Sequence, residues 1–141
     1  MADPLSVAAS CLAIGMAGAQ LSLALFKYAQ AFQTARTEVA EIADQISNLS
    51  NTLVLLGNIL EASQSFVKLE LLQQTQSIID RFKNVEQQLL ELIKTKKLLR
   101  FQWFFKAPKA KSLLTKIESI KTALTLVLTI IQLAKEQRTR T

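Results

Sequence analysis

Hydrophobic residues recur every three or four positions along three long stretches of the chain. Within 36–62 the seam residues are Val39, Ile42, Ile46, Leu49, Leu53, Leu56 and Leu60. Within 66–98 they are Leu71, Ile78, Phe82, Val85, Leu89 and Leu92, with one gap at Thr75. Within 109–136 they are Leu113, Ile117, Ile120, Leu124, Val127, Ile131 and Ala134. Such regular seams predict long helices that pack along their lengths at shallow crossing angles.

A fourth stretch, residues 4–31, is apolar on every side. Asp3 and Pro4 are a typical N-cap and first helical residue, so we expect the helix to begin there. No charge lies between Asp3 and Lys27. At ~1.5 Å per residue this run is long enough to cross the ~30 Å hydrocarbon core of a bilayer.

These elements predict a single all-α domain over residues 1–141, an antiparallel up-down four-helix bundle with an apolar N-terminal helix. Helices are expected at about 4–31, 36–62, 66–98 and 109–136, and strand signals are missing. Short connections favour antiparallel neighbours. The second helix is expected to end near 62–65, with Gly57-Asn58 as an alternative break.

The apolar N-terminal helix has several interpretations. A cleaved signal peptide normally begins with basic residues, whereas the early charge here is Asp3. A permanent anchor is weakened by Gln20 and by many small residues. The helix could instead be surrounded by the others in a soluble bundle. Small residues would allow close backbone approach in either a bundle or a membrane; they are Ala8, Gly15, Ala19 and Ser22 on one line and Gly18 on another.

Composition argues against an enzyme. Histidine is absent, and no glycine-rich phosphate loop occurs, so the usual general base, common metal sites and nucleotide cradles are missing. We therefore expect no catalytic residue, metal or cofactor. The single cysteine, Cys11, fits a small buried hydrophobe in a reducing compartment. Glu38, Glu41, Glu86 and Gln87 are interpreted as solvated helix surface.

The net charge of +6 conceals an asymmetry along the chain. Residues before Lys94 carry a net charge of −4, and those from Lys94 onward carry +10. An anionic partner would therefore meet the C-terminal third.

The connection at 94–111 carries seven basic residues, no acid, and Phe101, Trp103, Phe104 and Phe105. Aromatic and basic side chains together are typical of membrane interfaces, where each basic residue near anionic headgroups contributes about 1 kcal/mol. The same mixture binds single-stranded nucleic acid in other proteins. Alternatively, the aromatic residues cap the core of the bundle and the lysines form a solvated rim.

The first ten residues, Met-Ala-Asp-Pro-Leu-Ser-Val-Ala-Ala-Ser, resemble the opening of fungal N-terminal domains found on NOD-like (STAND) receptors. Arg100-Phe-Gln-Trp-Phe-Phe-Lys106 together with Ile120-Lys-Thr-Ala-Leu-Thr-Leu-Val-Leu128 is also similar to this group, the HeLo-like (HELL) family. The resemblance covers essentially the whole chain. It implies a helical bundle related to the domain of the animal necroptosis executioner pseudokinase.

The resemblance further implies a pore-forming effector of fungal programmed cell death and heterokaryon incompatibility, cytoplasmic at rest and at the plasma membrane when active. Homo-oligomerisation, driven by a NOD-like receptor or an amyloid-motif partner, would release the N-terminal helix. The chain would then be the N-terminal part of a larger protein, or the partner that triggers its oligomerisation would be a separate chain. A non-lytic interaction module that self-associates or docks a signalling partner is the alternative; nucleic acid is not expected as a partner.

Carried onto this chain, the resemblance places membrane insertion in 5–26 and contact with anionic membrane lipids in 94–111. The residues expected to insert are Leu5, Val7, Leu12, Ile14, Leu21, Leu23, Leu25 and Phe26. The residues expected to bind headgroups are Lys94, Lys96, Lys97, Arg100, Trp103, Lys106, Lys109 and Lys111.

Overall fold

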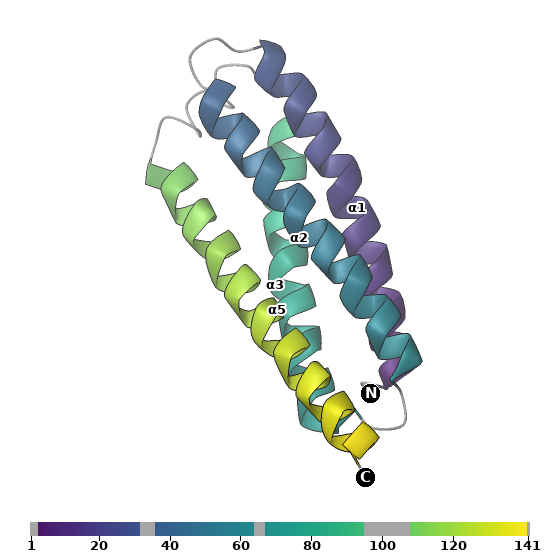
Figure 1. The fold of residues 1–141 in the computed structure, drawn as a ribbon. Coiled ribbons are helices and arrows are strands. Elements are labelled where there is room, and N and C mark those ends of the chain that lie inside the picture. The colour runs from purple at the N-terminus through teal and green to yellow at the C-terminus, as the bar shows by residue number, and fades with distance from the viewer. Residues whose placement is uncertain (1–2, 32–35, 64–66, 95–107, 141) are drawn as a thin grey trace.

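The computed structural model describes residues 3–31, 36–63, 67–94 and 108–140, which form four helices and no strand (Figure 1). The helices are α1 (Pro4–Ala31), α2 (Arg36–Ala62), α3 (Leu69–Lys94) and α5 (Pro108–Arg140). Each successive helix runs antiparallel to the one before it. The predicted all-α, up-down four-helix bundle with an apolar N-terminal helix is confirmed.

The helix ends follow local hydrogen bonding. Asp3 caps α1, because its carboxylate Oδ1 accepts a hydrogen bond from the Ser6 amide at 2.9 Å. The alternative break at Gly57-Asn58 is wrong, since α2 continues to Ala62. Helix α3 begins at Leu69 rather than 66, and α5 continues to Arg140 rather than ending at 136. The predicted third-helix end at 98 lies outside the described residues.

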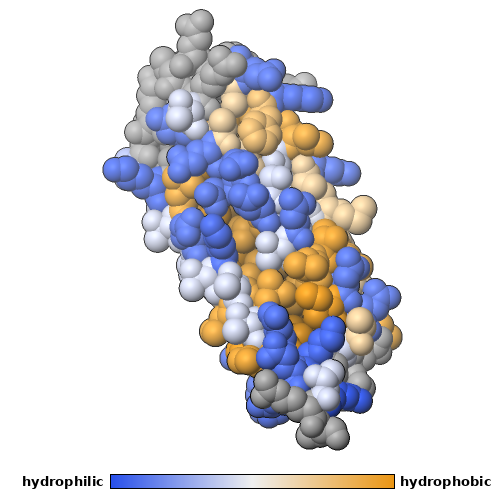
Figure 2. Space-filling model, viewed as in Figure 1, coloured by the Kyte–Doolittle hydropathy of each residue, from blue (hydrophilic) through white to orange (hydrophobic). Residues whose placement is uncertain are grey.

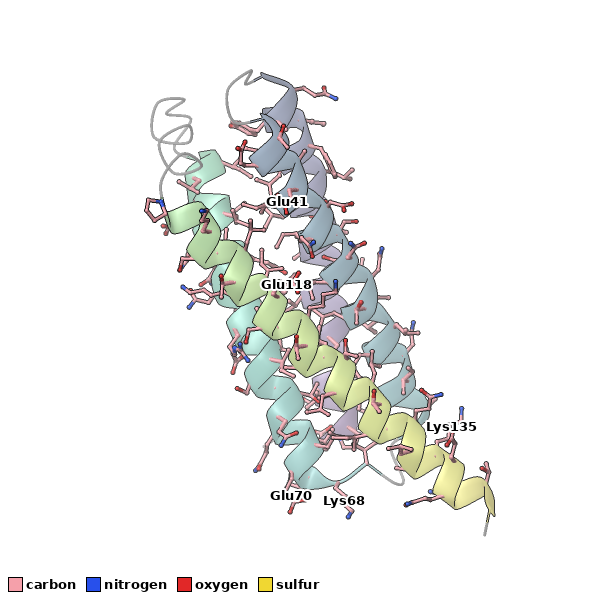
Figure 3. All side chains as sticks on the ribbon, turned by 60° about the vertical axis from the view of Figure 1, so that its left-hand side comes forward. Glu41, Lys68, Glu70, Glu118 and Lys135 are labelled. Atoms are coloured by element: carbon pink, nitrogen blue, oxygen red, sulfur yellow. The ribbon has the colours of Figure 1, made fainter. Side chains whose placement is uncertain are left out.

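The helices form a four-membered ring in which α1 packs on α2 and α3, and α5 also packs on α2 and α3. The consecutive helices α2 and α3 therefore lie across the diagonal (Figures 1 and 3). The expectation that short connections make consecutive helices neighbours holds for α1 and α2 but is wrong for α2 and α3. Six residues, 63–68, reach up to ~20 Å, whereas the diagonal of a bundle with neighbouring axes 8–10 Å apart is only ~13 Å.

The predicted seams form the core. All seven seam residues of α2 are buried, as are six of the seven in α5; Ala134 and Leu92 are half-buried. The gap at Thr75 is also buried, and its hydroxyl donates to the Leu71 carbonyl at 2.8 Å, so no polar group is left unpaired. Phe82 is the largest fully buried side chain.

Most charged side chains point outward, including Glu41, Glu118 and Lys135 (Figure 3). Glu38 and Gln87 are exposed, as predicted, but Glu86 is buried. That interpretation of Glu86 was wrong because Glu86 follows Phe82 by four residues and precedes Leu89 by three. It therefore shares their core-facing side of α3.

Replacing Leu124 with Asp should unfold the domain. Leu124 is fully buried on α5, so the Leu124→Asp change places an unpaired carboxylate in the core at a cost of several kcal/mol, comparable with the whole stability of a small domain. Lys121→Asp, one turn away on the exposed side, should change the melting temperature little. Thermal unfolding followed by circular dichroism measures both, and equal melting temperatures would show that the core face of α5 is assigned wrongly.

Candidate membrane-contacting surface

Helix α1 packs on α2 through residues with small side chains. A Cβ atom added at Gly15 would lie 2.8 Å from Val54 Cγ2 and 3.0 Å from the Ser50 carbonyl. One added at Gly57 would lie 3.0 Å from the Ala8 carbonyl. A side chain at either position would therefore force the facing helix to shift, and glycine permits this close approach of the two backbones.

Buried residues complete this inner face of α1. Ala8 and Ser22 of the predicted small-residue line are buried, whereas Ala19 of the same line is exposed. Ala29 is also buried. The Ser22 hydroxyl donates to the Ala43 carbonyl of α2 at 2.7 Å. The Tyr28 hydroxyl donates to the Ile93 carbonyl of α3 at 3.0 Å.

The outer face of α1 is apolar and open to solvent. Leu5, Met16 and Leu23 are 52%, 63% and 65% exposed, and no charge occurs between Asp3 and Lys27. Helix α1 is therefore a corner helix, and the interpretation that it is apolar because the other helices surround it is wrong. Its apolar outer side needs another explanation, since a solvent-facing helix side normally carries charges.

The structure divides the residues predicted to insert between the two faces. Val7, Leu21 and Leu25 are buried, and Leu12 and Ile14 are half-buried. Leu5, Leu23 and Phe26 are exposed. Sequence reasoning missed Met16, whose place in the middle of the exposed face follows from its spacing of seven residues from Leu23.

By length and composition, two described helical segments could cross a membrane: Pro4–Gln30 and Lys111–Thr139. Only 33% of the most apolar stretch of the first segment is buried, and 28% of that of the second. On α5, Leu126, Ile130 and Leu133 are exposed, whereas Leu128 is half-buried against the core. Figure 2 shows apolar side chains gathered on the lower half of the face formed by α2 and α5.

Most residues predicted to bind headgroups lie outside the described residues; these are Lys96, Lys97, Arg100, Trp103 and Lys106. The backbones of Lys94 and Lys109 are helical, but their side chains are also outside the described set. Lys111 is exposed on the first turn of α5. The structure therefore leaves the basic-aromatic connection as a prediction.

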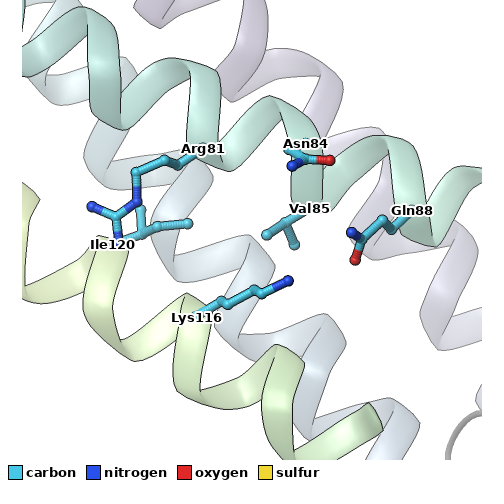
Figure 4. A pocket seen from close by; sticks show the side chains of 6 residues that line it. All are labelled: Arg81, Asn84, Val85, Gln88, Lys116 and Ile120. Atoms are coloured by element: carbon cyan, nitrogen blue, oxygen red, sulfur yellow. The ribbon is translucent and has the colours of Figure 1, made fainter.

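A second cationic feature lies between α3 and α5. Arg81, Asn84 and Gln88 of α3 and Lys116 of α5 line a groove of about 180 Å³ above Val85 and Ile120 (Figure 4). The Arg81 guanidinium Nη2 donates to the Ser119 hydroxyl at 2.6 Å. No acidic residue lines this groove. The sequence indicates it through the spacing of Arg81, Asn84 and Gln88, which are three and four residues apart and so share one face of α3.

Glu86 is a buried carboxyl where α3 meets α1. It is 8% exposed, and its Oε1 atom has no hydrogen-bond partner among the described residues. Removal from water disfavours the charged form, so burial raises the pKa of Glu86 to about 8. Within the described residues, no cluster of His, Cys, Asp and Glu side chains could hold a metal ion.

Over residues 2–141 the sequence matches the family described as the N-terminal region of the pigment biosynthesis cluster protein PigL. The chain belongs to this family. It is a fungal N-terminal domain family, so that part of the resemblance is confirmed. The PigL N-terminal match includes all four helices, and with them both faces of α1. Neither the curated proteins nor the solved structures provide a match.

The stability of this PigL N-terminal domain should fall as the pH rises through the range in which Glu86 titrates. Between the ordinary pKa of 4.5 and the folded value of about 8, the folded chain holds a proton that the unfolded chain releases. Each pH unit in that window should therefore lower the free energy of unfolding by up to about 1.4 kcal/mol.

The Glu86→Gln variant cannot titrate at this position, so its stability should depend much less on pH between 5 and 8. The chain has no histidine, whose ordinary pKa lies in the same range. Urea unfolding of both proteins at pH 5, 6, 7 and 8 measures the difference. Parallel stability profiles would mean that Glu86 is ionised in the folded domain.

Proposed function

We propose that this chain is a membrane-targeting domain of the HeLo-like type, a pore-forming effector of fungal programmed cell death that inserts α1 after oligomerisation. The observation that carries this proposal is the uncharged, exposed outer face of α1. A helix that enters lipid must be free of charge on every side, and α1 meets that condition from Leu5 to Phe26.

The packing of α1 also supports its release. Small residues interrupt its larger inner side chains, such as Leu21 and Leu25, and hydrophobic stabilisation scales with the apolar area removed from water, about 25 cal/mol per Å². Glycine, alanine and serine residues there bury little side-chain area. Several of its larger apolar side chains, including Met16 and Leu23, already lie outside. Insertion would bury the outer face, which the bundle leaves in water.

The dimensions agree with a membrane span. Residues 5–26 would extend ~33 Å as a helix, against ~30 Å for the hydrocarbon core. Asp3 and Lys27 bracket this segment and would remain at the two interfaces. The basic residues of 94–111 and the groove around Arg81 and Lys116 would contact anionic headgroups.

A lysine at Met16 should abolish membrane permeabilisation without unfolding the domain. Met16 is 63% exposed, so Met16→Lys is tolerated in water, but in the inserted helix it lies near the bilayer centre, where a charge costs ~2.5–3.5 kcal/mol. Leu55→Lys is the matched control, because Leu55 is 53% exposed on α2. The assay is dye release from anionic vesicles, with circular dichroism as the test of folding.

Dye release by the Met16→Lys variant at the wild-type rate would overturn insertion of α1. Absence of release by the wild type, even when copies are cross-linked, would favour the non-lytic interaction module. The exposed face of α1 also suits that second function, since it could dock a helix of a partner.

Reversal of charge in the basic connection should weaken binding to anionic vesicles. Changing Lys96, Lys97, Arg100 and Lys106 to Glu removes the positive charge expected to hold headgroups, at about 1 kcal/mol per residue. The control changes four lysines elsewhere, Lys68, Lys83, Lys121 and Lys135, which are exposed and give the same net charge. Vesicle co-sedimentation at rising salt measures both proteins; equal loss of binding would indicate attraction by overall charge alone.

A further inference from the structure

The contact between α1 and α3 contains an ionisable group with no counter-charge. Glu86 extends from α3 toward Gly18 of α1, and a Cβ added at Gly18 would lie 3.1 Å from Glu86 Oε1 and 3.1 Å from the Phe82 ring. The same added atom would collide with the Ser50 hydroxyl of α2. The carboxyl therefore lies in the narrow space where three helices meet.

No described residue forms a hydrogen bond with Glu86 Oε1 there. On α1, the residues around Gly18 are uncharged as far as Asp3 in one direction and Lys27 in the other. On α2, the Ser50 hydroxyl already donates to the Ile46 carbonyl at 2.8 Å, and the charged residues that flank it along the chain, Asp44 and Glu61, are exposed acids.

The charged residues nearest Glu86 on α3 are exposed. Lys83 lies three residues before it and Glu91 five after it, and neither forms a hydrogen bond with Glu86 Oε1. Arg81 points toward α5, where it binds Ser119 and lines the groove that contains Lys116 (Figure 4). In this position, without a partner for its charge, the Glu86 carboxyl is more stable with a proton than without one.

We propose that Glu86 is a proton-dependent latch that holds α1 on α3. With the proton bound, the neutral carboxyl fits against Gly18 and α1 stays docked. When α1 leaves, water reaches the carboxyl, which releases its proton to solvent, and the resulting carboxylate opposes return of the helix. In the proposed function, the latch would control when α1 is released. Only this biological role rests on the proposed function.

The size of the effect follows from the pKa of the docked state, about 8, against the ordinary value of 4.5. Between these values, each pH unit should favour the undocked helix by up to tenfold. The docked position of α1 is therefore most stable at pH 5 and less stable at pH 7 to 8. Release of α1 should be easier at neutral pH.

A groove beside Glu86 gives the carboxylate an alternative position. Ala17, Gln20, Leu21, Ala24 and Leu90 line an opening of about 220 Å³ beside Glu86. Ionisation could turn the carboxylate outward through this opening while α1 stays docked, and such a movement would exclude the latch. The experiment must therefore report on the position of α1 itself.

The accessibility of Cys11 reports the position of α1. Cys11 is the single cysteine of the chain and lies fully buried on the inner face of α1. The rate of its modification by a thiol reagent measures how often α1 leaves the bundle. Comparison with Glu86→Gln at each pH cancels the common effect of pH on thiol reactivity, because both proteins carry the same cysteine in the same contact.

The ratio of the two labelling rates, wild type over Glu86→Gln, should rise by up to tenfold per pH unit from pH 5 to 8 and level off above 8. A ratio that stays constant with pH overturns the latch and indicates that Glu86 ionises without displacing α1. Should Glu86→Gln fold poorly, Glu86→Met serves as the neutral reference. The carboxyl ¹³C shift of Glu86 in the wild type gives its titration directly, and a midpoint near pH 4.5 would also overturn the latch.

Hydrogen exchange distinguishes release of α1 from unfolding of the domain. With rising pH, amides of α1 should lose protection relative to the neutral variant, while amides around Leu124 of α5 keep theirs. Equal loss in both helices would overturn a latch specific to α1. None of these measurements involves a membrane, so failure of vesicle leakage would remove the proposed function and leave the latch standing, and the reverse also holds.

Discussion

The close approach of α1 and α2 is the constraint on which the other features depend. Glycines at positions 15, 18 and 57 allow it, and Gly15 and Gly57 have backbone atoms of the facing helix at 3.0 Å from where a Cβ would be. Around these glycines the interface leaves little room for side chains, and several of the larger apolar side chains of α1 lie on the opposite side of the helix. The exposed face of Leu5, Met16 and Leu23 is a consequence of the same packing. The Ser50 hydroxyl of α2 occupies the space that a side chain at residue 18 would need, and the Glu86 carboxyl and the Phe82 ring lie beside it.

The two halves of the ring differ in the kind of helix they contain. Helix α3 is amphipathic in the usual sense, with a buried seam and charged outer positions. Helix α5 has a similar buried seam but exposes Leu126, Ile130 and Leu133, and a polar groove that contains Arg81 and Lys116 lies between the two helices. Helix α1 carries no charge on either side from Leu5 to Phe26. Removal of α1 would expose the seams of α2 and α3 on one flank, so a released helix leaves behind a bundle with an open apolar side. That open side supplies a physical reason for copies to associate once α1 has left.

The sequence predicted the seams well because a heptad spacing depends only on local periodicity, and nearly every seam residue is buried. It could not predict that α2 and α3 lie diagonally, since a seam specifies that a helix faces the core and not which helix lies beside it. Glu86 was missed because an acidic residue was assigned to the surface by its type, although its spacing from Phe82 and Leu89 places it on the buried side. The exposed face of α1 could not be separated from its buried face, because both are apolar and only the glycine contacts distinguish them.

The two apolar helices are not equally suited to enter a membrane, although both are long and apolar enough by composition. The uncharged part of α5, residues 122–134, extends only ~20 Å, well short of the ~30 Å hydrocarbon core, and lysines flank it on both sides. The uncharged part of α1 exceeds that thickness. The inner face of α1 must be uncharged for the bundle to pack. Its lack of charge is therefore not evidence for membrane insertion. The outer face is under no such requirement in water, and its lack of charge over more than five turns is therefore the feature that a purely soluble role leaves unexplained.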